Sequence, residues 1–345
     1  MNSTKTVRSS KLVEDIAIID GQPGCGKTLF STICSYLERF EVMQYSSHIE
    51  NYLALKDLDE ISLNTCQSLC EIELDLLLYE SMMSRNTNFR YKDLSSVFRN
   101  KKFFMYLKRL FSKGDEIVPE EIKLKKPILN LCTHNLLGYL DPLYKCYLSK
   151  LKLLEVVRHP LYQIIQMSLN YETLEKTNGS RFFYIHLENN KEIIPFWAQD
   201  WDQYNELNYV EKAIHEIFFM TKKSENFKKM NPEAKVLTIP FEKFVKKPYE
   251  FIEEIKIFFD ADFIKPIRKI LKDQNVPRLK VADGIPEEVY KRCGWVKGEE
   301  GLNEKQELIK RRDFAINQEV SDFSMDLLDQ LSSSYEEKYN FLEND

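Results

Sequence analysis

Asp20-Gly21-Gln22-Pro23-Gly24-Cys25-Gly26-Lys27-Thr28 is the stretch of sequence that decides the fold. It fits the pattern G-x-x-x-x-G-K-[ST] and lies between the apolar residues 16–19 and a helix-like segment over residues 29–40, which is the strand–loop–helix context that the pattern requires. Its glycines permit positive φ, so consecutive N–H groups can converge on phosphate oxygens at a helix N-terminus. We therefore predict a nucleotide site whose phosphates are contacted by Gln22, Pro23, Gly24, Cys25, Gly26, Lys27 and Thr28.

Further apolar runs alternate with helical patterns along the chain. We expect strands at 40–45, 127–134, 151–157, 182–187 and 235–240, and helices at 139–148, 209–222 and 248–259. This alternation predicts a three-layer α/β fold of the P-loop nucleotide-binding type, with a mostly parallel sheet flanked by helices. Residues 50–115 read as a helical insertion and 300–345 as a helical tail, and we expect all of 1–345 to form a single domain.

Three polar positions fall where predicted strands end. Gly21 follows the first strand, His134 ends the strand at 127–134, and Arg158 follows the strand at 151–157. Ligands of open α/β sheets bind beyond the carboxyl ends of the strands. We therefore expect these three positions to meet in one crevice.

Charge and cysteine content narrow the class of protein. The 49 Lys and Arg against 54 Asp and Glu give a formal charge of −5, which argues against a nucleic-acid binder. Two basic stretches at 90–126 and 265–280 depart from this average, and each reads either as a solvated face or as a site for an anion. The 7 scattered cysteines suggest reduced thiols and no metal site. With no apparent signal peptide or membrane span, we expect a cytoplasmic protein without stable membrane insertion.

Arg158 bears on the type of chemistry. A nucleotide triphosphatase with such a loop usually has a second strand ending in Asp, which holds magnesium through water. The strand at 151–157 ends in Arg158 instead. An arginine there repels a metal and attracts a phosphate, so the sequence favours a reaction other than hydrolysis.

Taken together, three stretches resemble the sulfotransferases that use 3′-phosphoadenosine 5′-phosphosulfate: the glycine loop with Lys27 and Thr28, Thr133-His134, and the stretch 153–160 with Arg158. The late strand and turn at 235–248 are also similar to that family. The resemblance implies that the loop holds the 5′-phosphosulfate and Arg158 the 3′-phosphate. It also implies that Lys27 stabilises the departing group and that His134 is the general base, without a metal.

The sequence departs from the family at several positions. The family has Ser eight residues after the arginine, whereas Gln166 stands there and Ser168 follows two residues later; either could bind the 3′-phosphate. Cys132 replaces a common lysine, and the family's basic glycine loop has only a loose counterpart at 291–298. The resemblance leaves open a small-molecule, lipid or glycan acceptor carrying a hydroxyl or amine, and it leaves the oligomeric state undetermined.

Two other functions fit the same motifs. The complete loop with Thr28 also fits a kinase or triphosphatase that uses ATP and magnesium. A nucleotide-binding protein without catalysis is compatible with the altered positions Gln166 and Cys132.

Overall fold

The central element is a sheet of four parallel strands. The structure, a computed structural model, describes residues 5–91, 93, 95–99, 102–189, 191–201, 203–284, 301–340 and 342. The sheet has the order β2-β1-β3-β6 and consists of β1 (Asp15–Asp20), β2 (Ile128–Cys132), β3 (Leu151–Val157) and β6 (Lys235–Pro240). Every neighbouring pair is parallel. The carboxyl ends of all four strands therefore lie at the same edge of the sheet.

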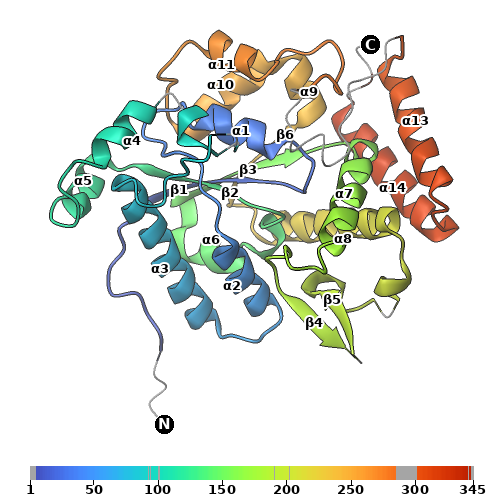
Figure 1. Cartoon of the computed structure of the whole chain (residues 1–345), viewed down its shortest axis with the longest axis horizontal. Helices are drawn as coiled ribbons and strands as arrows, with labels where there is room; N and C mark the ends of the chain where they lie inside the picture. Colours follow the sequence, from blue (N-terminus) through green and yellow to red (C-terminus); the bar gives the residue numbers. More distant parts are fainter. Residues whose placement is uncertain are drawn as a thin grey trace.

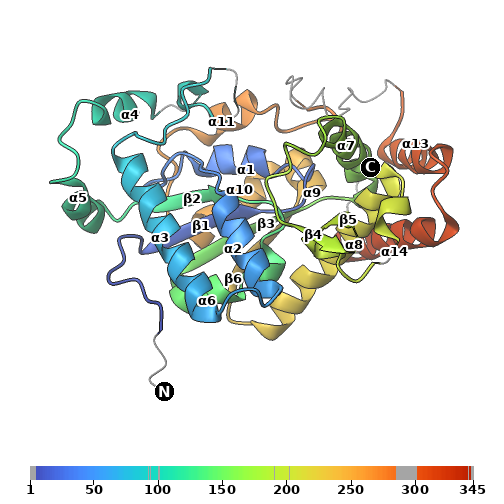
Figure 2. The ribbon, with the colours of Figure 1, turned by 60° about the horizontal axis from the view of Figure 1, so that its bottom comes forward.

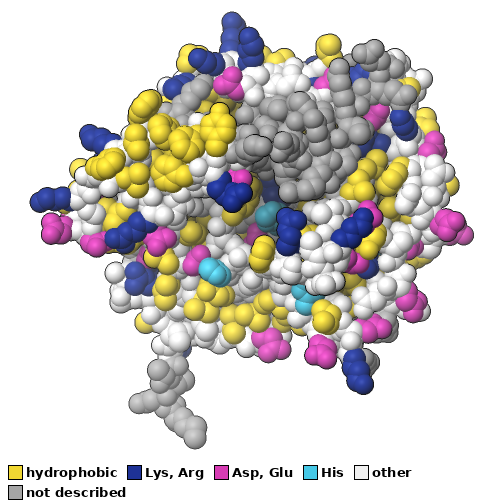
Figure 3. Space-filling model, in the orientation of Figure 1, with side chains coloured by type: hydrophobic (Ala, Val, Ile, Leu, Met, Phe, Trp, Pro, Cys, Tyr) yellow, Lys and Arg dark blue, Asp and Glu magenta, His cyan; other side chains and the backbone are white. Residues whose placement is uncertain are grey.

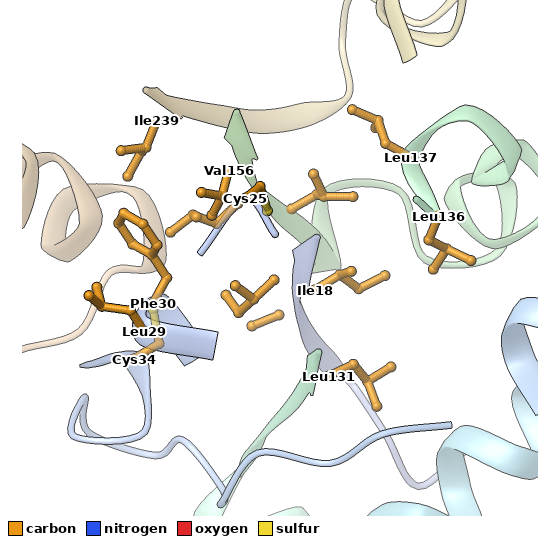
Figure 4. Packing of buried hydrophobic residues seen from close by; sticks show 14 of the residues in the cluster. Ile18, Cys25, Leu29, Phe30, Cys34, Leu131, Leu136, Leu137, Val156 and Ile239 are labelled. Atoms are coloured by element: carbon orange, nitrogen blue, oxygen red, sulfur yellow. The ribbon is translucent and has the colours of Figure 1, made fainter. Parts of the chain in front are cut away.

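The apolar side chains of these strands form the core of the fold. Residues 16–19 of β1 are at most 1% exposed, as expected for a parallel strand that is covered on both faces. Figure 4 shows Ile18 of β1 among side chains from β2, β3, β6 and the first helix, including Leu131, Val156, Ile239 and Phe30. Each such fully buried side chain contributes roughly 1.5–3 kcal/mol.

Helices cover both faces of the sheet. They are α1 (Lys27–Cys34), α2 (Ser47–Asp57), α3 (Leu63–Met82), α4 (Phe103–Arg109), α5 (Val118–Lys125), α6 (Asp141–Tyr147), α7 (Pro160–Glu175), α8 (Tyr209–Met230), α9 (Phe241–Lys246), α10 (Pro248–Phe259), α11 (Ile267–Asp273), α13 (Glu304–Asn317) and α14 (Asp322–Tyr339). Figures 1 and 2 show α1 and α10 on one side of the sheet, and α2, α3 and α6 on the other. The predicted α/β class with a mostly parallel sheet and a loop between β1 and α1 is confirmed.

The first helix and the segment after it differ from the prediction. α1 ends at Cys34 rather than at residue 40, and Asn130 of β2 donates to the Ser35 hydroxyl at 3.0 Å just beyond its end. Residues 40–45 were predicted as a strand, which is wrong: they run beside β2 with only two isolated bridges. One cause is that the Val42 amide donates to the Tyr106 hydroxyl at 2.7 Å instead of to a neighbouring strand.

The remaining elements lie outside the main sheet. The strand predicted at 182–187 is displaced to β4 (His186–Asn189), which pairs antiparallel with β5 (Glu192–Pro195). Helices α2–α5 occupy the predicted insertion and α13 and α14 the predicted tail, while the assignment of the whole chain to one domain stays a prediction. Across the described residues, every helix is too short or too polar to cross a membrane.

Candidate functional site

The phosphate loop, residues 21–26, connects β1 to α1. Gly26 immediately precedes α1 and has a left-handed φ of 96°. A Cβ at this position would lie 2.2 Å from the Phe241 ring, so both the backbone and the packing require glycine. The Lys27 ammonium donates to the Gln22 carbonyl oxygen at 3.3 Å, which keeps its charge against the loop. A helix N-terminus and a lysine charge thus combine at one place, as phosphate binding requires.

Arg158 follows β3 and lies against this loop. Its Nη1 donates to the Gly24 carbonyl oxygen at 2.7 Å, and its guanidinium lies 4.6 Å from the centre of the Phe241 ring. Its Nε is buried and has no hydrogen-bond partner among the described residues, because the Glu242 carboxylate lies 3.8 Å away, beyond hydrogen-bond distance. Burial lowers the pKa of Arg158. An anion beside the guanidinium would offset this unfavourable burial.

A cavity of about 120 Å³ opens between the loop and Arg158, and we call it the loop cavity. It is lined by most of the predicted phosphate-binding residues, namely Gly24, Gly26, Lys27, Thr28, Arg158 and Gln166. Arg278 and Phe241 also line it, and neither was among the predicted site residues. The basic stretch at 265–280, interpreted as either a solvated face or an anion site, was the only signal for Arg278. That basic stretch does not include Phe241, which directly follows β6 and lies in the segment 235–248 that resembles the family.

Gln166 and Ser168 occupy different environments on α7. The Gln166 side chain lies beside the loop, where its Oε1 would be 3.2 Å from a Cβ at Gly24. Ser168 is buried and donates to the Ile165 carbonyl oxygen at 3.0 Å, and it is not among the described residues that line the loop cavity. Of the two alternatives, Gln166 is therefore the residue placed to contact a ligand.

The side chains of Gln22 and Cys25 do not face the loop cavity. Gln22 Nε2 donates to the Ile217 carbonyl oxygen at 3.2 Å and to the Thr221 hydroxyl at 3.1 Å, which turns the side chain toward α8. Cys25 is buried, and burial raises the pKa of its thiol to about 11, so it is an apolar packing residue rather than a nucleophile. Any contribution of these two residues to phosphate binding comes from their backbone.

His134 lies just beyond the end of β2 and is held by Glu50 of α2. One Glu50 oxygen, Oε1, accepts from the His134 backbone N–H at 2.6 Å and lies 3.2 Å from Nδ1 of its ring. The ring is stacked on Tyr45 with its centre 6.0 Å away, and the side chain is 50% exposed. When Nδ1 donates to Glu50, the other ring nitrogen is free to accept a proton.

His134 lines a second cavity of about 450 Å³, which we call the histidine cavity. Aromatic side chains form much of its wall, including Tyr45, Tyr139, Tyr184, Phe196 and Trp197. Pro23 of the phosphate loop lines this cavity, whereas Gly24 and Gly26 line the loop cavity. Residues of the loop therefore line both cavities, and His134 and Arg158 line different ones.

Glu216 of α8 is a further site residue that the sequence did not indicate. It lines the histidine cavity, accepts from Asn135 at 3.1 Å and accepts from the Tyr171 hydroxyl at 2.5 Å. Burial raises the pKa of Glu216, while Tyr171, Lys27 and His134 act in the opposite direction. Lys27 lines the loop cavity, His134 lines the histidine cavity, and both act electrostatically on this one carboxyl group. Glu216 therefore lies near both cavities. Glu216 lies within the long α8 pattern, so sequence spacing alone could not single it out.

Comparison with known proteins gives matches only at the level of structure. No protein-family model and no curated protein matches the sequence. Solved structures similar to the chain include the sulfotransferase domain from the curacin biosynthetic pathway, with 14% identity and a TM-score of 0.40 over 90% of this chain and 99% of that one. A sulfotransferase from Mycobacterium avium has 10% identity and a TM-score of 0.39 over 96% and 78%.

A mouse sulfotransferase complexed with PAP is also similar, with 14% identity and a TM-score of 0.35 over 93% of this chain and 90% of that one. All three are sulfotransferases. With TM-scores below 0.5 and such low identities, the likeness carries no argument about activity or substrate.

Proposed function

We propose that the protein transfers a sulfuryl group from 3′-phosphoadenosine 5′-phosphosulfate to a hydroxyl or amine. The observation that carries this proposal is Arg158, a buried guanidinium at the end of β3 whose Nε lacks a hydrogen-bond partner among the described residues and which lines the loop cavity. A donor with two separate phosphate positions suits a cavity that has the phosphate loop on one side and an arginine on the other. Arginine and lysine, the side chains that bind phosphates, also line this cavity.

The residues of the loop cavity have distinct roles in this scheme. The loop N–H groups and Lys27 hold the 5′-phosphosulfate and stabilise the negative charge that grows on the bridging oxygen. Arg158 and Gln166 hold the 3′-phosphate. The Phe241 ring packs against the Arg158 guanidinium, whose central carbon lies 4.6 Å from the ring centre. Arg278 lies 5.4 Å from the same ring and adds positive charge to this end of the cavity. The scheme needs no metal.

His134 removes the proton of the acceptor. Glu50, 3.2 Å from Nδ1, orients the ring and favours the tautomer in which Nε2 carries the lone pair. This leaves Nε2 as the atom that accepts the proton, and Glu50 stabilises the imidazolium that results. The acceptor site is then the histidine cavity, because His134 lines it beside Pro23 of the phosphate loop.

The lining of the histidine cavity narrows the acceptor class. None of the described residues that line it is Lys or Arg, while two of them, Glu50 and Glu216, are acidic. A polyanionic glycan would meet uncompensated like charge there. The aromatic walls instead suit a compact acceptor with an apolar body. We therefore assign a neutral or cationic small molecule that carries a hydroxyl or amine.

Thermal unfolding with candidate ligands tests this proposal against its alternatives, since a ligand that binds only the native state raises the melting temperature. We expect stabilisation by 3′-phosphoadenosine 5′-phosphate without magnesium, and no comparable effect of ATP. Stabilisation by ATP only in the presence of magnesium would replace the proposal with a kinase or triphosphatase, which the complete loop and Thr28 favour. Stabilisation by the bisphosphate without turnover on neutral and cationic acceptors would favour a nucleotide-binding protein without catalysis.

A further inference from the structure

Exposed aromatic side chains cluster over α4. Phe89, Tyr91, Phe98, Phe104 and Phe111 all have substantial solvent exposure, and we call them the aromatic patch. Three of them are mostly exposed: Tyr91 by 75%, Phe104 by 77% and Phe111 by 85%. Figure 3 shows the apolar side chains gathered at the upper left of the molecule, in the region of α4 in Figure 1. A contiguous apolar patch of this kind marks an interaction site more often than single exposed residues do.

The opposite side of α4 is firmly attached to the protein. The Tyr106 hydroxyl donates to Glu41 at 2.5 Å, and Arg109 donates to both oxygens of the same carboxylate at 2.6 and 2.9 Å. Lys102 donates to the carbonyl oxygen of Phe40 at 2.5 Å. These bonds fix the inward face of α4, so the outward direction of Phe104 and Phe111 is not the result of a loosely packed helix.

The segment that carries the aromatic patch is strongly basic. Residues 89–111 contain seven Lys and Arg but only one Asp and no Glu, in a chain whose formal charge is −5. Two of these cations, Lys102 and Arg109, bond to the inner network. Lys108 lies between Phe104 and Phe111 on the outward side and is exposed. Among the described residues of the segment, Arg90 pairs with Asp93 at 3.4 Å, and Lys108 is the exposed cation beside the rings. The net positive charge of the segment favours an anionic surface.

We propose that the aromatic patch binds reversibly to the surface of a membrane that contains anionic lipids. Aromatic rings prefer the interface between headgroups and acyl chains, and lysine and arginine beside them attract anionic headgroups. Each basic residue near such a surface strengthens binding, and the exposed rings add apolar burial. A single-stranded nucleic acid would also attract the cations and stack its bases on the rings, so binding of the native chain to single-stranded oligonucleotides but not to anionic vesicles would assign the aromatic patch to that partner instead. This inference is independent of the proposed sulfuryl transfer.

Vesicle flotation tests the inference with the full chain. The variants are Phe104→Gln/Phe111→Gln and, as a matched control, Ile257→Gln/Phe323→Gln, which changes two exposed apolar side chains on α10 and α14. We expect the native chain to float with vesicles of phosphatidylcholine and phosphatidylserine, and less with phosphatidylcholine alone. The patch variant should lose at least about tenfold in partitioning, and the control should behave as the native chain. Added salt should weaken binding.

Three outcomes would overturn the inference. They are no binding of the native chain to anionic vesicles, equal binding of the patch and control variants, and a change in the native oligomeric state caused by the patch variant without any vesicle binding. The last result would assign the aromatic patch to a contact between copies of the chain. Because Phe104 and Phe111 are exposed, their replacement should leave the melting temperature unchanged, which checks that the variant folds.

Discussion

Replacement of Arg158 by alanine should weaken binding of 3′-phosphoadenosine 5′-phosphate by about 2–4 kcal/mol, or roughly 30- to 1,000-fold. The lower figure corresponds to one charge-assisted hydrogen bond from the guanidinium, which lines the loop cavity. The higher figure adds a second donor atom and the support that Arg158 gives the loop through the Gly24 carbonyl oxygen. Arg158→Lys should recover only part of the affinity, because an ammonium keeps the charge but lacks the planar fork.

Isothermal titration calorimetry measures this loss directly, without an acceptor. Arg312→Ala is the matched control, because Arg312 is a half-exposed arginine that bonds to Asp329 on the surface. Thermal unfolding of each ligand-free variant separates a binding effect from a folding effect. An affinity of Arg158→Ala within twofold of the native value, with the fold intact, would refute the assignment of Arg158 to the 3′-phosphate.

Three further predictions concern other parts of the molecule. His134→Ala should lower turnover by about 10²- to 10⁴-fold while leaving the calorimetric affinity for the bisphosphate unchanged. Glu50→Gln should lower turnover by a smaller factor. Full activity of His134→Ala would exclude His134 as the base. Gly26→Ala should destabilise the protein and abolish bisphosphate binding. The control is Gly301→Ala, at a similar φ of 89° but with nothing within 4 Å of its Cβ, which should cost only about 1 kcal/mol in chemical denaturation. Equal losses of stability in the two variants would show that contact with Phe241 is unimportant. Burial alone would raise the pKa of Glu41, but the hydrogen bond and charge of Arg109, together with the Tyr106 hydrogen bond and the Lys102 charge, hold that pKa below its usual range. The stability that Glu41 contributes is therefore present above the unfolded-state pKa and is lost as the pH falls through the lower native one. Urea denaturation of Glu41→Gln should show a loss of about 3 kcal/mol near neutral pH and a flatter decline in acid than the native chain, and an unchanged acid decline would contradict this reasoning.

The strands β3 and β6 were predictable because their signals are local. Residues 151–157 and 235–240 are short apolar or β-branched runs bounded by charged or proline residues, and β3 and β6 have these bounds. The helix at 248–259 is equally local, since Pro248 opens α10 and Asp260 ends it in a left-handed conformation. In each case the residues that define the element lie within it or directly beside it.

The features that the sequence missed depend on residues far away in the chain. Residues 40–45 have the composition of a strand, but the Val42 amide donates its hydrogen bond to the Tyr106 hydroxyl instead of to a neighbouring strand. The close packing around Gly26 is explained only once Phe241, more than 200 residues later, is in place. Arg278 and Glu216 enter the site for the same reason. Motif spacing identifies residues that act within their own loop. It does not identify residues that reach the site only because the fold brings distant segments together.

The position of the phosphate loop has a consequence for engineering. Among the described residues, none lines both cavities, and within the loop Pro23 faces one of them while Gly24 and Gly26 face the other. Under the proposed function, acceptor binding and donor binding would therefore depend on separate sets of side chains. If the proposed function holds, substitutions confined to the aromatic wall of the histidine cavity, such as Phe196 and Trp197, should change acceptor preference and leave the affinity for 3′-phosphoadenosine 5′-phosphate unchanged.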